Sequence, residues 1–230
     1  MKTMLMLTVL SVLAILGGCA ASPATQIYHH TLAKERKIEN TVVIDKPFEQ
    51  AWNDIIKRMT VTQYRINNIE KSSRIINLDF QADTATDVEK YIDCGASTRV
   101  ITFKGKPRNF NYALAGTQSY EMVEKNNYFY WYEVSPHVNL TGTVNVYMSP
   151  LNAKQTELSV NARYALRRVL SGKYYTQRRD GEYRESGDFH WDPIRVTLTT
   201  KKPGIYAEKP FVQCVSTGAL EKEFLNYARE

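Results

Sequence analysis

The chain has 230 residues and a formal net charge of +6 at pH 7, and 43% of its residues are hydrophobic. This length supports one substantial domain or two small ones. The positive charge is moderate and spread along the chain, so it indicates no particular anionic partner. Fifteen tyrosines are an unusually large share.

Residues 1–18 have the three parts of a secretory signal peptide. Lys2 supplies the positive charge, an apolar run extends from Met4 to Leu16, and two glycines precede Cys19. The apolar run is shorter than the about 20 residues needed to span a bilayer. We therefore expect the segment to be cleaved and the chain to be exported from the cytoplasm. Nucleic acid is not an expected partner of an exported protein.

The sequence Leu16-Gly17-Gly18-Cys19 resembles the lipobox of bacterial lipoproteins. The resemblance implies cleavage before Cys19 and covalent attachment of lipid, palmitate included, to that residue. Because Ala20 rather than Asp follows, it also implies anchorage in the outer membrane at its periplasmic face. The alternative is an ordinary cleavage site that happens to contain a cysteine. No other cofactor and no metal are expected.

Residues 19–39 show little apolar periodicity, so we predict a lipidated N-terminus and flexible tether. A single periplasmic domain is then expected over residues 40–230. Once Cys19 carries lipid, Cys94 and Cys214 remain as a pair in an oxidising compartment, which favours a disulfide. Such a bond would close a loop of about 120 residues and contribute about 4 kcal/mol. The alternative is two unpaired buried thiols.

The first elements of the domain follow from hydrophobic periodicity. Residues 41–44 predict a short strand, and Asp45 and Pro47 predict the start of an amphipathic helix over 48–59. A hairpin is expected at 64–69 and 76–82, and a further strand at 98–103. Residues 104–116 are predicted to form a long loop.

Strict alternation then predicts two long strands, 140–148 and 158–166, joined by a turn at Pro150-Leu151-Asn152. A strand at 195–200 and a closing helix capped by Ser216 or Thr217 complete the chain. The predicted fold class is therefore α+β: a twisted antiparallel sheet with an N-terminal amphipathic helix and a C-terminal helix packed on it.

The opening of this domain resembles a known module. The stretch from Val42 to Trp52, followed by Glu70-Lys71-Ser72-Ser73-Arg74-Ile75-Ile76, is similar to the helix-grip modules of outer-membrane assembly lipoproteins of the BamC type. The resemblance implies a helix-grip-like fold and brings no catalytic residues.

The sequence offers little support for an enzyme. Its four histidines, His29, His30, His137 and His190, are scattered, and Asp79 and Asp83 have no identifiable partner acid. No standard nucleophile, metal or phosphate-binding motif occurs. We expect no catalytic site.

Two surfaces are candidates for binding a partner. The aromatic run predicts Tyr128, Tyr130 and Tyr132 on one face of a strand and Phe129 and Trp131 on the other, although core packing of both faces is an equal alternative. The second is a basic and aromatic stretch, for which a solvated hairpin is the alternative. Its residues are Arg167, Arg168, Lys173, Tyr174, Tyr175, Arg178, Arg179, Tyr183 and Arg184.

An anchor, a tether and a domain without a catalytic site lead to one functional hypothesis. We expect a non-enzymatic binding or structural subunit of an envelope assembly or secretion complex, whose partners are other envelope proteins or a second copy. The alternative is a periplasmic carrier or sensor of a small apolar or envelope ligand held in a helix-grip cavity.

Overall fold

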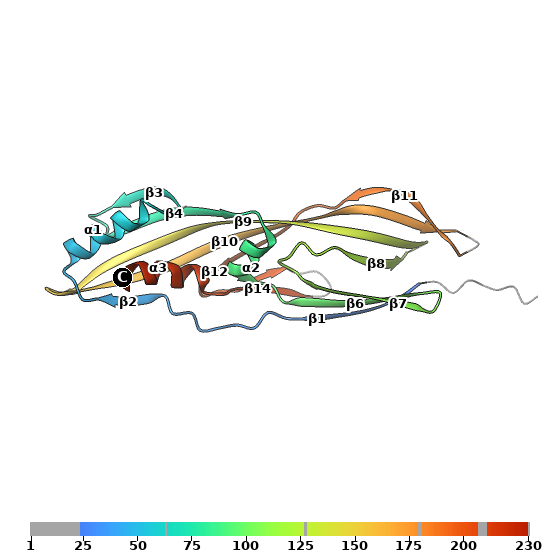
Figure 1. The fold of residues 1–230 in the computed structure, drawn as a ribbon, viewed down its shortest axis with the longest axis horizontal. Helices are drawn as coiled ribbons and strands as arrows, with labels where there is room; N and C mark the ends of the chain where they lie inside the picture. Colours follow the sequence, from blue (N-terminus) through green and yellow to red (C-terminus); the bar gives the residue numbers. More distant parts are fainter. Residues whose placement is uncertain (1–23, 63, 127, 179–180, 207–210, 230) are drawn as a thin grey trace, which may run out of the picture.

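The computed structural model describes residues 24–62, 64–126, 128–178, 181–206 and 211–229. It is an elongated molecule built mostly of antiparallel strands with three helices (Figure 1), in agreement with the predicted α+β class. The predicted signal peptide and Cys19 lie outside the described residues. No described helix is both long and apolar enough to cross a bilayer.

The element bounds are as follows. The helices are α1 (Phe48–Met59), α2 (Ala85–Tyr91) and α3 (Ala219–Arg229). The first strands are β1 (Thr25–Thr31), β2 (Thr41–Ile44), β3 (Arg65–Glu70), β4 (Ile75–Ala82), β5 (Ile92–Asp93), β6 (Ala96–Phe103) and β7 (Lys106–Ala113). The later strands are β8 (Tyr120–Lys125), β9 (Phe129–Asn152), β10 (Gln155–Gln177), β11 (Tyr183–His190), β12 (Ile194–Thr199), β13 (Gly204–Tyr206) and β14 (Val212–Ser216).

The hairpin of β9 and β10 forms the long axis of the molecule (Figure 1). Its strands have 24 and 23 residues, so the predicted hairpin is confirmed and extends well beyond the predicted bounds. Alternate side chains along both strands are buried, as the alternation predicts. The turn falls after Asn152, whose side-chain oxygen accepts a hydrogen bond from the Lys154 amide at 2.8 Å. It therefore lies slightly later than the predicted Pro150-Leu151-Asn152.

The described strands form three sheets, of which the largest contains this hairpin. The largest has the order β11-β10-β9-β4-β3, with β12 and β2 also paired to β10 and β8 paired to β9. A second sheet has the order β1-β6-β7, and a third the order β13-β14-β5. Figure 1 shows β1, β6 and β7 below β8 and β9, toward the end of the molecule opposite α1.

The helices cover the half of the hairpin that contains its turn. Helix α1 buries Ala51, Trp52, Ile55 and Met59 and contacts β9, β10 and α3, which confirms the predicted helix. Pro47 occupies its N-cap and no side chain caps it, so the capping role predicted for Asp45 is wrong. At α3 the Thr217 hydroxyl accepts a hydrogen bond from the Ala219 amide, as predicted.

Two segments predicted to be irregular are strands. Residues Thr25–Thr31 of the predicted tether form β1, which pairs with β6, so the tether prediction is wrong there. Lys106–Ala113 of the predicted long loop form β7, the other neighbour of β6. Both are edge strands held mainly by backbone hydrogen bonds, and most of their side chains are exposed. Hydrophobic patterning cannot reveal such strands, because they bury little apolar surface.

Candidate ligand cavity and aromatic surface

A cavity of about 160 Å³ lies where the sheet of β1, β6 and β7 approaches the long hairpin. We call it the inter-sheet cavity. Its lining residues are Tyr28, Cys94, Arg99, Tyr112, Leu114, Tyr120, Met122, Leu166, Arg168, Leu170, Trp191, Ile194, Val196, Tyr206, Val212 and Cys214. The lining is mostly aromatic and aliphatic, with two arginines. None of the lining residues comes from α1, so the cavity is not the one expected beneath that helix.

Arg168 enters the cavity from the long hairpin. It follows Leu166 and precedes Leu170 on the inward face of β10, and it lies opposite Val138 of β9 and Ile194 of β12. Only 6% of Arg168 is exposed, and its Nε and Nη2 atoms have no hydrogen-bond partner among the described residues. The prediction that groups Arg168 with a basic outer surface is therefore wrong.

Arg99 reaches the same cavity from β6. Its guanidinium lies 4.6 Å from the ring centroid of Tyr28 and 5.3 Å from that of Tyr120, in cation–π contacts. Its Nε donates a hydrogen bond to the Tyr112 hydroxyl at 3.3 Å. The Tyr112 and Tyr120 rings stack with centroids 4.1 Å apart. The aromatic faces hold Arg99 in place without neutralising its charge.

The electrostatic environment favours negative charge. None of the described lining residues is an aspartate or glutamate, and no described carboxylate forms an ion pair with either arginine. Burial raises the pKa of Tyr28 and of Tyr120, while the nearby arginines oppose this shift. Both hydroxyls are therefore protonated at neutral pH and add no negative charge. The cavity thus combines two cations with apolar walls.

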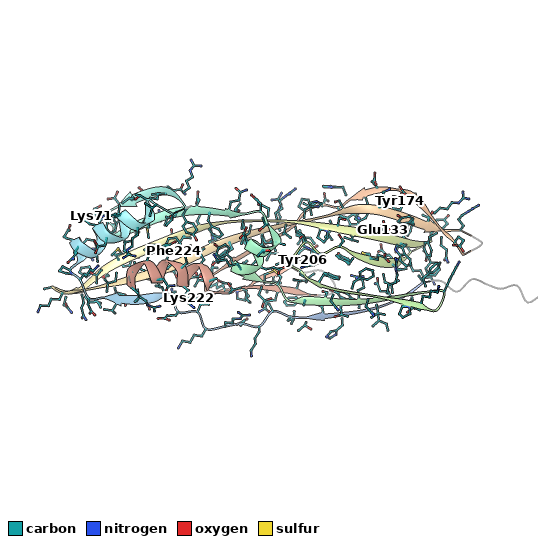
Figure 2. All side chains as sticks on the ribbon, in the orientation of Figure 1. Lys71, Glu133, Tyr174, Tyr206, Lys222 and Phe224 are labelled. Atoms are coloured by element: carbon teal, nitrogen blue, oxygen red, sulfur yellow. A yellow bond between two sulfur atoms is a disulfide. The ribbon has the colours of Figure 1, made fainter. Side chains whose placement is uncertain are left out.

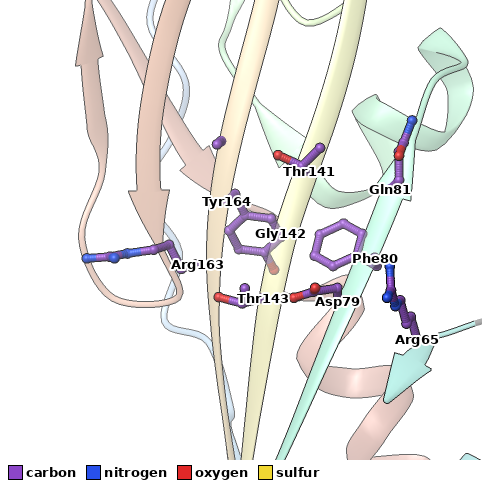
Figure 3. Close-up of a pocket in the computed structure, with 10 residues that line it drawn as sticks. Arg65, Asp79, Phe80, Gln81, Thr141, Gly142, Thr143, Arg163 and Tyr164 are labelled. Carbon is purple, nitrogen blue, oxygen red and sulfur yellow. The ribbon is translucent and has the colours of Figure 1, made fainter. Parts of the chain in front are cut away.

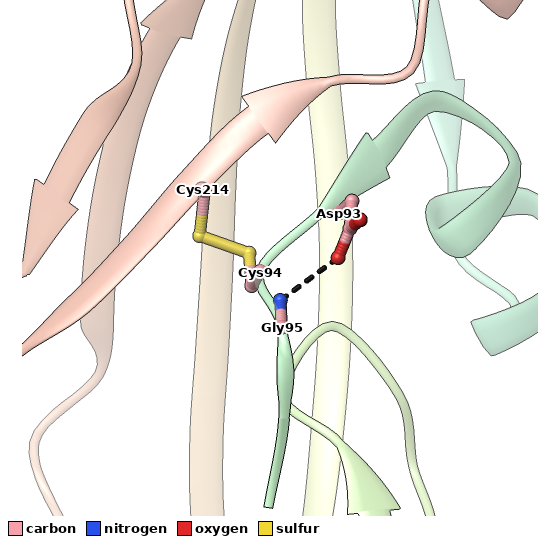
Figure 4. Close-up of a disulfide and its surroundings, with 4 residues drawn as sticks. All are labelled: Asp93, Cys94, Gly95 and Cys214. Carbon is pink, nitrogen blue, oxygen red and sulfur yellow. Dashed lines mark hydrogen bonds between the residues drawn. A yellow bond between two sulfur atoms is a disulfide. The ribbon is translucent and has the colours of Figure 1, made fainter. Parts of the chain in front are cut away.

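The predicted disulfide closes one side of the cavity (Figure 4). Cys94 and Cys214 are bonded at an S–S distance of 2.03 Å, and both are almost fully buried. The Gly95 amide donates to the Asp93 carboxylate at 2.8 Å, which shapes the chain beside the bond. Cys214 also pairs with Gly204 in the small sheet. The predicted cysteine pair is confirmed, and the alternative of unpaired thiols is wrong.

The aromatic run Tyr128–Tyr132 divides between core and surface. Trp131 is buried in a small cluster with Ala24 and Ile101, against which Phe103, Tyr175 and Tyr183 pack. Its ring lies 5.7 Å from Phe103 and 5.6 Å from Tyr183. Trp131 and Tyr175 are therefore mainly core residues rather than free surface, whereas Tyr128 is 65% exposed.

The other rings form what we call the aromatic surface: Tyr130, Tyr132, Tyr174, Phe189 and Trp191. All five are half-buried. The Tyr132 ring lies 5.3 Å from Phe189, 5.4 Å from Trp191 and 6.3 Å from Tyr174. The structure thus brings together the predicted Tyr130, Tyr132 and Tyr174 and adds two residues that the sequence did not indicate. Figure 2 places Tyr174 near the end of the molecule opposite Lys71.

Of the two predicted binding arginines, Arg178 does not join this surface. Arg178 is exposed, and its backbone amide donates to the Glu182 carbonyl at 2.8 Å, across the turn. Arg179 lies outside the described residues.

A wider polar hollow lies on the outer face of the main sheet (Figure 3). Arg65, Asp79, Thr143 and Arg163 are neighbours in register across β3, β4, β9 and β10. One oxygen of Asp79 is buried without a described partner. Beneath the hollow, the Phe80 and Tyr164 rings flank Gly142, with centroids 5.7 Å apart. The floor of the hollow is therefore formed by these core rings.

The candidate catalytic residues do not converge. His29, His137 and His190 are exposed at separate places. The Nδ1 of His30 donates to the Ala96 carbonyl at 3.1 Å and lies 3.2 Å from the Ser97 hydroxyl. Asp83 accepts hydrogen bonds from the Gln81 and Asn139 amides. Within the described ranges, no group of three or more His, Cys, Asp or Glu side chains is arranged to hold a metal.

The geometry therefore offers two candidate binding features: the inter-sheet cavity and the adjoining aromatic surface, which share Trp191. No protein-family model, curated protein or solved structure matches the chain.

Proposed function

We propose that this chain is a non-enzymatic binding or structural subunit of an envelope assembly or secretion complex. In this proposal a lipid on Cys19 anchors it in the outer membrane, with the domain in the periplasm. The resemblance of residues 42–52 and 70–76 to BamC-type modules supports a helix-grip-like arrangement of α1 and α3 on the sheet. The lipobox supports the anchor.

The observation that carries this proposal is the aromatic surface. Partly exposed aromatic rings are enriched in protein interfaces, because they bury large areas at a small cost in conformational entropy. Five of them lie together on β9, β10 and the chain around β11, away from the helices. A protein partner that covers them would bury apolar area that the isolated chain leaves half-exposed.

Site-specific photocrosslinking in cells tests the proposal. The full chain carries a photoreactive phenylalanine at Tyr132 or, as a matched control, at Tyr147. Tyr147 lies on the same strand but near the helix-covered end and is 42% exposed. We expect a discrete adduct with an envelope protein at Tyr132 and none at Tyr147. Equal labelling at both positions, or none at Tyr132, contradicts the proposal.

The anchor is tested separately in the same cells. We expect Cys19→Ser to abolish incorporation of radiolabelled palmitate and to release the protein from the outer-membrane fraction. Labelling that persists in this variant contradicts the lipoprotein proposal.

A carrier or sensor of a small envelope ligand is a second candidate function. The specific observation in its favour is the inter-sheet cavity, which contains a buried arginine with unsatisfied donors. The ligand class is the small apolar or envelope ligand expected from the sequence, but the proposed site lies between two sheets and not beneath α1.

A further inference from the structure

We propose that the inter-sheet cavity binds a small organic carboxylate, with Arg168 and Arg99 holding the carboxylate and the apolar walls holding its hydrocarbon body. This inference rests on the carrier function, the second candidate above, and names its ligand class.

The first support is the state of Arg168. A guanidinium removed from water loses its hydration, and such groups are normally paired or bonded through most of their donors. Arg168 is 94% buried, since 6% of it is exposed, yet Nε and Nη2 have no described partner. These two nitrogens form one edge of the guanidinium, the edge that binds the two oxygens of a carboxylate in parallel.

The second support is the balance of charge. Arg99 adds a second cation whose described contacts are the rings of Tyr28 and Tyr120 and the hydroxyl of Tyr112. Neither arginine has a described carboxylate to neutralise it. A bound anion supplies the missing charge, and in these low-dielectric surroundings its attraction to two guanidinium groups is stronger than in water.

The third support concerns the remainder of the ligand. Leu166, Leu170, Ile194 and Val196 form the wall around Arg168, so the cavity accepts an apolar body as well as a charged head. Its volume of about 160 Å³ is close to the roughly 150 Å³ of an engineered apolar cavity that accepts benzene. A ligand the size of a single ring or a short acyl chain therefore fits, whereas a complete lipid does not.

We place the entry to the cavity beside Trp191 and Arg99, which line it and are both half-exposed. Trp191 belongs to the aromatic surface as well. Its indole fluorescence therefore reports on occupancy.

The test compares benzoate with benzamide, which has nearly the same shape but no charge. Full-length protein in a non-ionic detergent is titrated with each compound, and with inorganic phosphate, in a buffer free of carboxylates. Calorimetry measures Kd. Tryptophan fluorescence is followed in the wild type and in Trp191→Phe, and the difference isolates the Trp191 signal from those of Trp52 and Trp131. We expect benzoate to bind at least about tenfold more tightly than benzamide, as one charged hydrogen-bonded pair provides.

Two variants and a matched control locate the site. Arg168→Met and Arg99→Met each remove one cation while retaining an unbranched side chain, and Arg167→Met removes the exposed neighbouring arginine of β10. We expect the preference for benzoate to disappear in Arg168→Met, to weaken in Arg99→Met and to persist in Arg167→Met. Circular dichroism verifies that each variant is folded. If Arg168→Met does not fold, Arg99→Met and the wild-type comparison still decide the result.

The outcomes separate the ligand class from the carrier function. If benzamide binds as tightly as benzoate, the carboxylate inference is wrong and the carrier function stands. If phosphate binds as tightly as benzoate, the apolar part of the inference is wrong. If benzoate, benzamide and phosphate all fail to bind, both the inference and the carrier function are wrong. Unchanged benzoate preference in Arg168→Met also overturns the inference.

Discussion

The Tyr164 hydroxyl of β10 lies 3.1 and 3.2 Å from the two carboxyl oxygens of Glu221 on α3. Both residues are fully buried, and the Thr200 hydroxyl donates to Glu221 at 2.7 Å. No described cation lies in this group. These hydrogen bonds therefore attach the last helix to the long hairpin by satisfying polar atoms that have no access to water.

Tyr164→Phe should weaken this attachment. The variant leaves Glu221 with fewer donors in the interior, and we expect a loss of about 1–3 kcal/mol in the free energy of unfolding. Urea denaturation followed by circular dichroism measures the loss. Tyr147→Phe, on exposed β9 surface, is the control and should change stability by less than about 0.5 kcal/mol. Equal stability of the two variants contradicts this account.

Gly142→Ala should destabilise the centre of the main sheet. A Cβ atom at Gly142 would lie 2.1 Å from Phe80 Cε1 and 2.8 Å from the Arg163 carbonyl oxygen. The Arg163 carbonyl is backbone of the paired strand β10 and cannot turn aside as a side chain can, so overpacking should cost about 1–3 kcal/mol. Combining the change with Phe80→Leu should recover part of the loss. A neutral Gly142→Ala substitution means that the ring is free to move.

Loss of the disulfide should be among the largest single effects on stability. The double substitution Cys94→Ser and Cys214→Ser opens a link across a sequence separation of 120 residues. We expect a loss of about 4–5 kcal/mol in the chain-entropy model. Chemical denaturation of the variant, and of the wild type with and without reductant, measures it. A reduced wild type as stable as the oxidised protein contradicts this prediction.

Two residues of the aromatic run should differ sharply in their contribution to the free energy of unfolding. Trp131→Ala removes a buried ring from the small core cluster, and we expect a loss of about 3–5 kcal/mol. Tyr128→Ala, at an exposed position, should cost less than about 0.5 kcal/mol. Thermal and urea unfolding of both variants distinguish them. Similar losses would show that the run is not divided between core and surface.

Alkaline pH should destabilise the protein through its buried tyrosines. Burial raises the pKa of Tyr64, Tyr120 and Tyr164 above the ordinary value of 10.0. Above about pH 10 the unfolded chain loses these protons while the folded chain retains them, so the free energy of unfolding falls as pH rises. Below that pH the contribution is fully present. Urea denaturation between about pH 8 and about pH 11 should show the fall.

Tyrosinate absorbance checks the cause of this pH dependence. The three buried tyrosines should ionise together with unfolding and not before it. Ionisation of all tyrosines in the folded state at about pH 10 contradicts the proposed cause.

The parts of the fold that bury alternating apolar residues were predictable from the sequence. Strand β4 and the β9–β10 hairpin present such a pattern, and α1 presents apolar residues at helical spacing. The cysteine pair follows from an even count after Cys19 is set aside. Strands β1 and β7 escaped prediction because their backbone partners hold them, while their side chains remain largely exposed.

The candidate cavity was missed for a different reason. An arginine in a polar, basic stretch resembles a surface residue, and Arg168 was interpreted in that way. The alternation that begins at Leu158 continues through Leu166 to Leu170 and places position 168 on the inward face. Extending that pattern would have identified Arg168 as buried. Arg99 and its ring partners come together from β1, β6, β7 and β8, and only the tertiary structure shows this.

The long hairpin also sets the order in which the chain can fold. Five other strands pair with β9 or β10, namely β2, β4, β8, β11 and β12. Strands that lie between residues 41 and 199 therefore depend on the same two strands for their pairing. Pairings so distant in sequence close slowly, because loop entropy is lost before contacts form. Until β10 joins β9, strands such as β2 and β4 have unpaired edges that can add to other chains. The interval before the hairpin closes is therefore the period in which this protein is most exposed to aggregation.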